Sequence, residues 1–267
     1  MTTALAVRVL GPVEVGTAAG PVPLGASLRT LLAALAVDAG RVVAADTLAD
    51  RLWDDGGLDA GSSTVHSYVS RLRRRLEPPP GAQGWRVLRT RAPGYLLELE
   101  PGALDAAEFR RLLAAARAGA GADPATARER VARALALWRG PAYADVGAGF
   151  AREEAARLRE QQLEAEELAA ELDLALGRHR TLAERLPALV AAEPFREGLR
   201  ASLVLALYRS ARQADALRAY EEGRALLADA LGVDPGPHLR RLHELVLRQD
   251  PALDAPVAVP AAPVVPA

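Results

Sequence analysis

Residues 60–76 combine an apolar stripe with small hydroxyl and guanidinium side chains at helical spacing. On a helix of about 100° per residue, the four apolar residues fall within about 60° of one another: Val65, Val69, Leu72 and Leu76. The opposite side carries Ser63, Ser67, Ser70, Arg71 and Arg74, flanked by His66 and Arg73. Small residues let a helix approach a surface closely, and arginine donors match phosphate oxygens or the O6/N7 edge of guanine. The stretch predicts a helix seated in the major groove of DNA, or else a solvated basic face on an ordinary amphipathic helix.

Basic charge is concentrated around this stretch, although the 267-residue chain has a formal net charge of only −1. Residues 1–97 contain 11 arginines and 8 acidic residues, whereas residues 98–267 contain 22 arginines and 26 acidic residues. Residues 71–91 alone contain seven arginines and one acidic residue, Glu77. Such a local concentration of positive charge is typical of a protein that binds a polyanion.

The sequence around the 60–76 helix predicts a small α+β domain that holds it. Alternating residues that end at Gly11-Pro12 indicate a first strand at 5–10, and apolar spacings of three and four indicate helices. Asp46 is expected to cap the second of these helices. The other expected elements are strands at 13–15 and 22–24, helices at 28–36 and 46–53, and a hairpin of 85–91 with 95–99.

Together these elements predict a winged helix-turn-helix with an N-terminal sheet. Arg89 and Arg91 lie on the terminal hairpin, close to its turn at Ala92-Pro93-Gly94. A hairpin beside a recognition helix can reach the neighbouring minor groove or phosphates. We therefore expect two arginine-bearing elements to converge on one side of the domain and to bind double-stranded DNA.

Residues 1–98 resemble the OmpR/PhoB-type winged helix. The resemblance rests on Leu52-Trp53, on Tyr-Val-Ser-Arg-Leu-Arg-Arg-Arg-Leu at 68–76 and on Thr-Arg-Ala-Pro-Gly-Tyr at 90–95. It implies that the 60–76 helix is the recognition helix and that the hairpin is the wing. The residues expected to bind DNA, from the helix pattern and the resemblance together, are Thr64, His66, Ser67, Ser70, Arg71, Arg73, Arg74, Arg89, Thr90 and Arg91. The resemblance also implies that the loop at 54–60, with its three aspartates, contacts RNA polymerase.

From Gly102 onward the sequence predicts helices only. Asp105 is expected to cap a helix that ends near Gly119, and Pro124 occupies a first-turn position in the next helix. A long helix is expected from about 150 to 176, with the glutamates between 153 and 171 on a solvated face.

An internal repeat follows the long helix. Residues 174–179 and 208–213 occupy equivalent helix-to-helix turns 34 residues apart. Each is followed by an amphipathic helix and an acid-proline pair, and a last helix is expected at 237–248. A 34-residue helix-turn-helix period is that of tetratricopeptide repeats, which stack because one repeat cannot bury its own apolar face. The second half is therefore expected to be an all-α, tetratricopeptide-like domain that serves either as an interaction platform or as a helical spacer.

This second half resembles the bacterial transcriptional activator domain. The resemblance rests on Trp-Arg-Gly-Pro at 138–141, Pro-Phe-Arg-Glu at 194–197, Leu-Tyr-Arg at 207–209, Leu-Gly-Val-Asp-Pro-Gly-Pro at 231–237 and Arg-Gln-Asp-Pro at 248–251. A winged helix followed by this domain is the arrangement of the Streptomyces antibiotic regulatory protein (AfsR/DnrI/RedD) family. The resemblance implies a transcriptional activator, commonly of a secondary-metabolite gene cluster. It would bind direct repeats upstream of promoters and recruit RNA polymerase through the sigma or alpha subunit.

The expected division is therefore a winged-helix domain at 1–98, an activator domain at 99–251 and a disordered tail of proline, alanine and valine at 252–267. Repeat-mediated homodimerisation, or cooperative pairing on DNA, is a further expectation. A second hypothesis remains open, in which the chain is a helical-repeat scaffold whose winged helix binds protein rather than DNA.

Several classes of function are not indicated by the sequence. The chain has no cysteine, no His-Glu-x-x-His pattern, no lysine for a phosphate-binding loop and no Gly-x-Ser-x-Gly. We therefore expect no metal, no cofactor and no enzymatic activity. The N-terminus lacks a basic region followed by an apolar run, and no apolar stretch is long enough to cross a membrane. A cytoplasmic, nucleoid-associated protein without membrane partners is expected.

Overall fold

The computed structural model describes residues 5–53, 62–77 and 85–254. The chain divides into two compact units, of which one contains residues 1–114 and 133–163 and the other contains residues 115–132 and 164–267. The first unit therefore includes residues well beyond the boundary at 98 that the sequence suggested for the winged helix.

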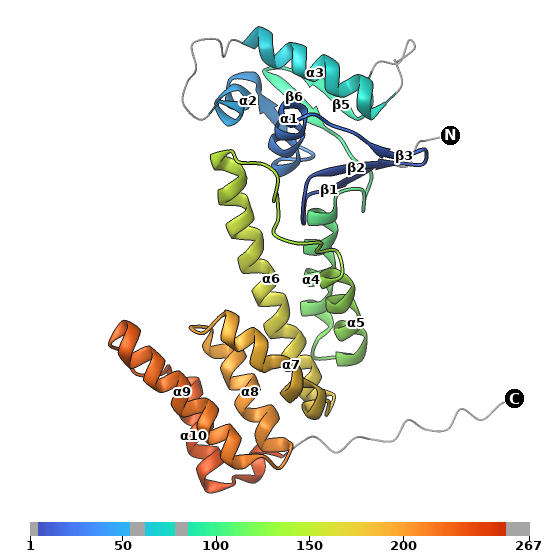
Figure 1. Ribbon diagram of the computed structural model, residues 1–267. Helices are drawn as coiled ribbons and strands as arrows, with labels where there is room; N and C mark the ends of the chain where they lie inside the picture. The colour runs from blue at the N-terminus through green and yellow to red at the C-terminus, as the bar shows by residue number, and fades with distance from the viewer. Residues whose placement is uncertain (1–4, 54–61, 78–84, 255–267) are drawn as a thin grey trace, which may run out of the picture. The chain divides into compact units, whose positions relative to one another are not determined.

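The first unit begins with the expected winged helix-turn-helix (Figure 1). Its elements are β1 (Ala6–Arg8), β2 (Glu14–Thr17), β3 (Gly20–Val22), α1 (Ala26–Val37), β4 (Val42–Ala44), α2 (Ala45–Leu52), α3 (Ser62–Leu76), β5 (Leu88–Arg91) and β6 (Gly94–Leu97). The first three strands form one antiparallel sheet in the order β1-β2-β3, and the other three form a second sheet in the order β4-β6-β5. The predicted N-terminal meander and terminal hairpin are thus confirmed.

The strand β4 of the winged helix was not expected from the sequence. It pairs antiparallel to β6, with Val43 opposite Tyr95 and Ala44 opposite Gly94. The backbones approach so closely that a Cβ atom on Gly94 would lie 1.8 Å from the carbonyl oxygen of Val43. Glycine is therefore required at the point where the hairpin joins the body of the domain.

The core of the winged helix is built from the helical stripes that the sequence predicted. In α1, Leu31, Leu32 and Leu35 are fully buried, and Leu48 of α2 and Leu72 of α3 join them. The expected cap of α2 was wrong, because the residue that precedes the helix is Ala44 and no side chain caps it. Asp46 lies in the first turn of α2, where its negative charge is favourable at the positive end of the helix dipole.

The remainder of the described chain is helical, as expected. Its elements are α4 (Asp105–Gly119), α5 (Pro124–Leu135), α6 (Gly149–Ala175), α7 (His179–Ala192), α8 (Glu197–Arg209), α9 (Gln213–Leu231), α10 (Pro237–Arg248) and the short 3₁₀ helix η1 (Pro251–Leu253). In the second unit, α7 packs on α8, α8 packs on α9, and α10 packs on both α8 and α9. This succession of antiparallel helices confirms the tetratricopeptide-like architecture.

Two details of the helical half differ from expectation. Glu154 is buried rather than solvated, and its Oε1 accepts a hydrogen bond of 2.5 Å from Nη2 of Arg110. Leu253, which the sequence placed in the tail, is buried against the core of the second unit, and its carbonyl oxygen accepts a hydrogen bond from Nε of Arg209. The packed part of the chain therefore continues past residue 251.

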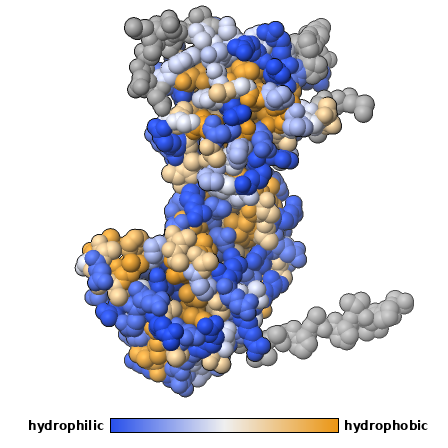
Figure 2. Space-filling view, viewed as in Figure 1, coloured by the Kyte–Doolittle hydropathy of each residue, from blue (hydrophilic) through white to orange (hydrophobic). Residues whose placement is uncertain are grey.

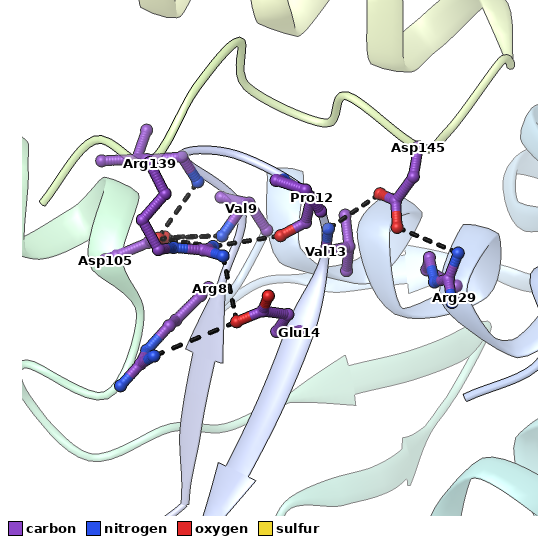
Figure 3. A network of polar contacts seen from close by, with 10 residues as sticks. Arg8, Val9, Pro12, Val13, Glu14, Arg29, Asp105, Arg139 and Asp145 are labelled. Atoms are coloured by element: carbon purple, nitrogen blue, oxygen red, sulfur yellow. Dashed lines mark hydrogen bonds and ion pairs between the residues drawn. The ribbon is translucent and has the colours of Figure 1, made fainter. Parts of the chain in front are cut away.

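A polar network fastens the N-terminal sheet of the first unit to residues that follow the winged helix (Figure 3). The buried carboxylate of Asp105, the first residue of α4, accepts hydrogen bonds from the main-chain amides of Val9, Leu10 and Ala106 at 2.8–3.0 Å. The sequence predicts Asp105 only as the cap of its own helix. Burial raises its pKa, and the three amides together with the nearby charge of Arg139 oppose that rise.

Two further residues complete this network. Nη2 of Arg139 donates to the carbonyl oxygen of Pro12 at 3.0 Å, and its Nη1 lies 3.0 Å from a carboxylate oxygen of Glu14. Asp145 accepts a hydrogen bond from the amide of Val13 at 2.8 Å and pairs with Arg29 at 2.9 Å. The loop between α5 and α6 therefore holds the β1–β2 turn in place.

Candidate nucleic-acid interface

The helix α3 buries one face and exposes another, as its sequence pattern predicts. Its four apolar stripe residues are at most 4% exposed: Val65, Val69, Leu72 and Leu76. The exposed side chains on the far side are those of Ser67, Ser70, Arg71 and Arg74. Figure 2 shows hydrophilic residues gathered over the C-terminal half of α3, above more hydrophobic ones.

The exposed arginines of α3 are not neutralised within the described part of the chain. No carboxylate pairs with Arg71 or Arg74 among the described residues; the Nε of Arg74 only reaches the carbonyl oxygen of Ser70, at 3.4 Å. Arg71 and Arg75 line a surface cavity together with residues 25–28 at the start of α1. Guanidinium groups without carboxylate partners are suited to an external anion such as a phosphate.

A third side of α3 faces the hairpin. It carries Arg73 and His66, both of which were predicted to bind DNA. The Nε of Arg73 donates to the carbonyl oxygen of Leu88 at 2.8 Å, and its Nη2 donates to Oγ1 of Thr90 at 2.7 Å. The Arg73 guanidinium also lies 5.8 Å from the ring centroid of Trp85 and 5.6 Å from that of Tyr95. Arg73 and Thr90 thus bind each other, with Arg73 half-buried and Thr90 exposed.

His66 is attached to the same hairpin. Its Nδ1 is hydrogen-bonded to the hydroxyl of Tyr95, and the two rings meet edge to face with centroids 5.9 Å apart. Burial raises the pKa of Tyr95, and the charge of Arg73 opposes that rise. Burial also lowers the pKa of Arg73. His66 and Arg73 therefore belong to a seam between the recognition helix and the wing.

The two arginines of the wing do not behave alike. Successive side chains on a strand point to opposite faces, so Arg89 lies on the face away from Thr90 and α3. Arg89 pairs there with Glu98 across the hairpin. Arg91 is exposed beside the hairpin turn and has no carboxylate partner within the described residues. Arg91 is thus an exposed cation at the hairpin turn, whereas Arg89 is paired with a carboxylate.

Three residues that hold the wing were not predicted from the sequence. Tyr95 and Trp85 supply the rings around Arg73, and the carboxylate of Glu77 accepts hydrogen bonds of 3.0–3.1 Å from the amides of Arg86 and Val87. The seven-residue spacing of His66 and Arg73 was the available signal, because it puts both on one side of the helix.

One of the remaining predicted contacts lies among the residues that the structure describes, and the predicted polymerase-binding loop lies outside them. Thr64 is half-buried at the N-terminal end of α3. The loop at 54–60, with Asp54, Asp55 and Asp59, lies outside the described residues, as does the tail after residue 254. Among the described helices, none is long and apolar enough to span a lipid bilayer.

Comparison with known proteins identifies both halves of the chain. Residues 19–97 match the family described as transcriptional regulatory protein, C terminal, and residues 104–247 match the bacterial transcriptional activator domain. The chain is 42% identical over 253 residues to regulatory protein AfsR of Streptomyces coelicolor, which covers 94% of this chain and 25% of AfsR. It is 40% identical over 268 residues to transcriptional regulator RedD of the same organism, which covers 98% of this chain and 75% of RedD.

A solved structure shares the fold. Mycobacterium tuberculosis EmbR, in complex with a low affinity phosphopeptide, aligns with a TM-score of 0.87 and 36% sequence identity. The alignment covers 93% of this chain and 66% of the EmbR chain. The chain thus spans about a quarter of the length of AfsR and two thirds of the EmbR chain.

Proposed function

The chain belongs to the family of transcriptional regulators that join a transcriptional regulatory C-terminal domain to a bacterial transcriptional activator domain, and we propose that it is a sequence-specific, DNA-binding activator of transcription. The observation that carries the proposal is the division of α3 into a buried apolar face and an exposed face. The exposed face carries small hydroxyl side chains and guanidinium groups that have no carboxylate partner among the described residues. That exposed face has the size and donor chemistry that the major groove of DNA accepts.

In the proposed complex, α3 lies in the major groove with Arg71 and Arg74 on base edges or phosphates. Ser67 and Ser70 allow the helix backbone to approach the bases closely. Arg91 at the hairpin tip reaches the adjacent minor groove or its phosphates. Arg73, Thr90 and Arg89 are already bound within the protein, so we assign them no direct contact with DNA.

The helical half is proposed to serve as the platform for assembly and activation. Stacked helical repeats present extended surfaces to partners, which suits a homodimer or a cooperative pair on promoter direct repeats. Recruitment of RNA polymerase, through its sigma or alpha subunit, is part of the same proposal. The resemblance to Streptomyces antibiotic regulatory proteins supports a target in a secondary-metabolite gene cluster and a location on the nucleoid.

The salt dependence of DNA affinity tests this proposal. Fluorescence anisotropy with a labelled random duplex should show binding that weakens about tenfold or more between roughly 50 and 200 mM salt, because phosphate contacts release counterions. From a pool of random duplexes the full chain should then select a defined sequence. Absence of binding, or affinity indifferent to salt, would instead favour a scaffold whose winged helix binds protein. A strict stoichiometry of one chain on a two-site duplex would count against cooperative pairing.

A further inference from the structure

The side chains of His66, which is exposed, and of Arg73, which is half-buried, both contact the hairpin. Seven residues are two turns of helix, so the two side chains lie one above the other on a single side of α3. That side lies between the buried stripe and the exposed face with Ser67, Ser70 and Arg71. The hairpin is thus attached to the recognition helix along its length, and Arg73 makes the larger set of contacts.

We propose that Arg73 is a positioning residue that fixes the outer strand of the hairpin against α3, so that the helix and the hairpin tip engage one DNA duplex in a defined relation. The proposal rests on the proposed DNA-binding function. It gives Arg73 a role different from the direct DNA contact that its place in the sequence pattern suggested.

The chemistry of this contact requires arginine. Because β5 is the outer strand of the β4-β6-β5 sheet, its carbonyl groups that point away from β6 have no strand partner. The amide of Glu98 binds the carbonyl of Val87, so the next carbonyl, that of Leu88, points outward, and Nε of Arg73 satisfies it. The planar fork reaches Thr90 with a second donor while its flat face lies near two aromatic rings.

The position of the contact links it to the exposed cation of the wing. Thr90 directly precedes Arg91, so the bond from Arg73 to the Thr90 hydroxyl holds the residue immediately before the one proposed to reach DNA. Glu77 holds the other end of the strand through the amides of Arg86 and Val87. Without Arg73, the hairpin would remain tethered at its base and through Tyr95, but its outer strand would be free near the tip.

A lysine at position 73 isolates this role, because it keeps the positive charge but cannot bind Leu88 and Thr90 together. The matched control is Arg75→Lys on the same helix, since Arg75 is exposed and lines the cavity at the start of α1 rather than the hairpin. Thr90→Val removes one acceptor of the Arg73 fork and keeps the shape of the side chain. All variants are made in the full chain and tested on a duplex that the wild-type chain selects from a random pool.

We expect Arg73→Lys to weaken binding of the selected duplex about tenfold. Hydroxyl-radical protection of the minor groove by the hairpin should be lost, while protection of guanine N7 atoms by α3 against dimethyl sulfate persists. Thr90→Val should give a weaker form of the same pattern, and Arg75→Lys should leave the minor-groove protection in place. Loss of both protections together, with a lowered melting temperature, would reduce Arg73 to a residue that only supports the fold and would overturn the proposal.

Hydrogen exchange in the DNA-free chain provides a readout that does not depend on DNA binding. The amides of 88–91 should exchange faster in Arg73→Lys than in wild type, with the exchange of α1 unchanged. Wild-type exchange rates in the hairpin of Arg73→Lys would overturn the positioning role whether or not the chain binds DNA. A wild-type chain that binds no duplex would overturn the DNA-binding proposal separately.

Discussion

The Oδ1 atom of Asp105 lies 2.8 Å from the main-chain nitrogen of Val9, which precedes it by 96 residues. One buried carboxylate thereby joins the segment that directly follows β1 to the first helix of the activator half. Arg139 and Asp145 hold the adjacent β1–β2 turn from the loop after α5. The N-terminal sheet is therefore completed by residues that the sequence assigns to the other domain.

Replacing Asp105 by asparagine should destabilise the first unit. Both carboxylate oxygens accept amide hydrogens, whereas an asparagine offers one acceptor and turns a donor toward the amide of Val9, Leu10 or Ala106. One buried amide left unsatisfied costs about 1–3 kcal/mol. Urea unfolding followed by tryptophan fluorescence is a suitable measurement, because Trp53, Trp85 and Trp138 all lie in the first unit. An unfolding midpoint equal to that of wild type would contradict the assigned role.

The pH dependence of this effect follows from the direction of the pKa shift. Burial raises the pKa of Asp105 above its ordinary value of 3.8, so the folded chain binds this proton more tightly than the unfolded chain. The stability due to protonation is present below pH 3.8 and is lost as the pH rises through the raised pKa. The free energy of unfolding of wild type, relative to Asp105→Asn, should therefore decline over that window.

The pKa of Asp123 is shifted in the opposite direction to that of Asp105. Hydrogen bonds from Thr126 at the start of α5 lower its pKa, so its stabilising effect should be present above pH 3.8 and be lost as the pH falls through the lowered pKa. In far-ultraviolet circular dichroism, the difference between wild type and Asp123→Asn should grow with rising pH. If the stability difference between wild type and the asparagine variant changed with pH in the same direction for both aspartates, the local environments would not determine the two effects.

Two truncated chains should show whether residues 1–98 are as stable alone as they are within the longer compact unit. A chain of residues 1–98 lacks Asp105, Arg139 and Asp145, and leaves the amides of the β1–β2 region without their partners. We expect it to unfold at lower urea concentration than a chain of residues 1–163, measured by the fluorescence of Trp53 and Trp85, which both fragments contain. Equal midpoints for the two chains would place the folding boundary near residue 98 after all.

What the sequence predicted well was what depends on local spacing. The stripe from Val65 to Leu76 was identified because a helix repeats every 3.6 residues. The last helix was expected from Pro237 to about Arg248, and α10 spans those residues. Both features follow from neighbours within a few turns.

What the sequence did not predict depends on distant partners. Val42–Ala44 is too short to be recognised as a strand, and it becomes one only because β6, some 50 residues later, pairs with it. Likewise, nothing near Arg73 or Asp105 indicates Thr90 or Val9 as a partner. The roles of these residues therefore emerged only from the folded arrangement.

Gly94→Ala should loosen the wing. The added Cβ atom would meet the carbonyl oxygen of Val43 at 1.8 Å, so β4 and β6 must separate at that point. Overpacking of this kind costs about 1–3 kcal/mol or more. The substitution should lower the urea concentration at the unfolding midpoint, followed by tryptophan fluorescence, and should weaken DNA binding. Gly147→Ala in the same unit is the control, because no atom lies within 4 Å of its added Cβ. Equal destabilisation by both substitutions would indicate a general effect of replacing glycine rather than a close approach at Gly94.

Alanine substitution of the exposed arginines of α3 should show which kind of DNA contact, to a base or to a phosphate, each of them makes. If Arg71 or Arg74 reads a base, its replacement by alanine should cost about 1–3 kcal/mol on the selected duplex and relax specificity at one position. If it binds a phosphate, alanine should weaken all sequences alike and reduce the slope of log affinity against log salt by about 1. The control is Arg218→Ala on α9, which also removes one exposed positive charge and should leave both specificity and salt slope near wild type. Because the two α3 arginines lack carboxylate partners within the described chain, their loss frees no buried acid, and a change in affinity reports on DNA directly. An Arg71→Ala/Arg74→Ala double variant that protects the same bases as wild type would show that this face of α3 does not read DNA.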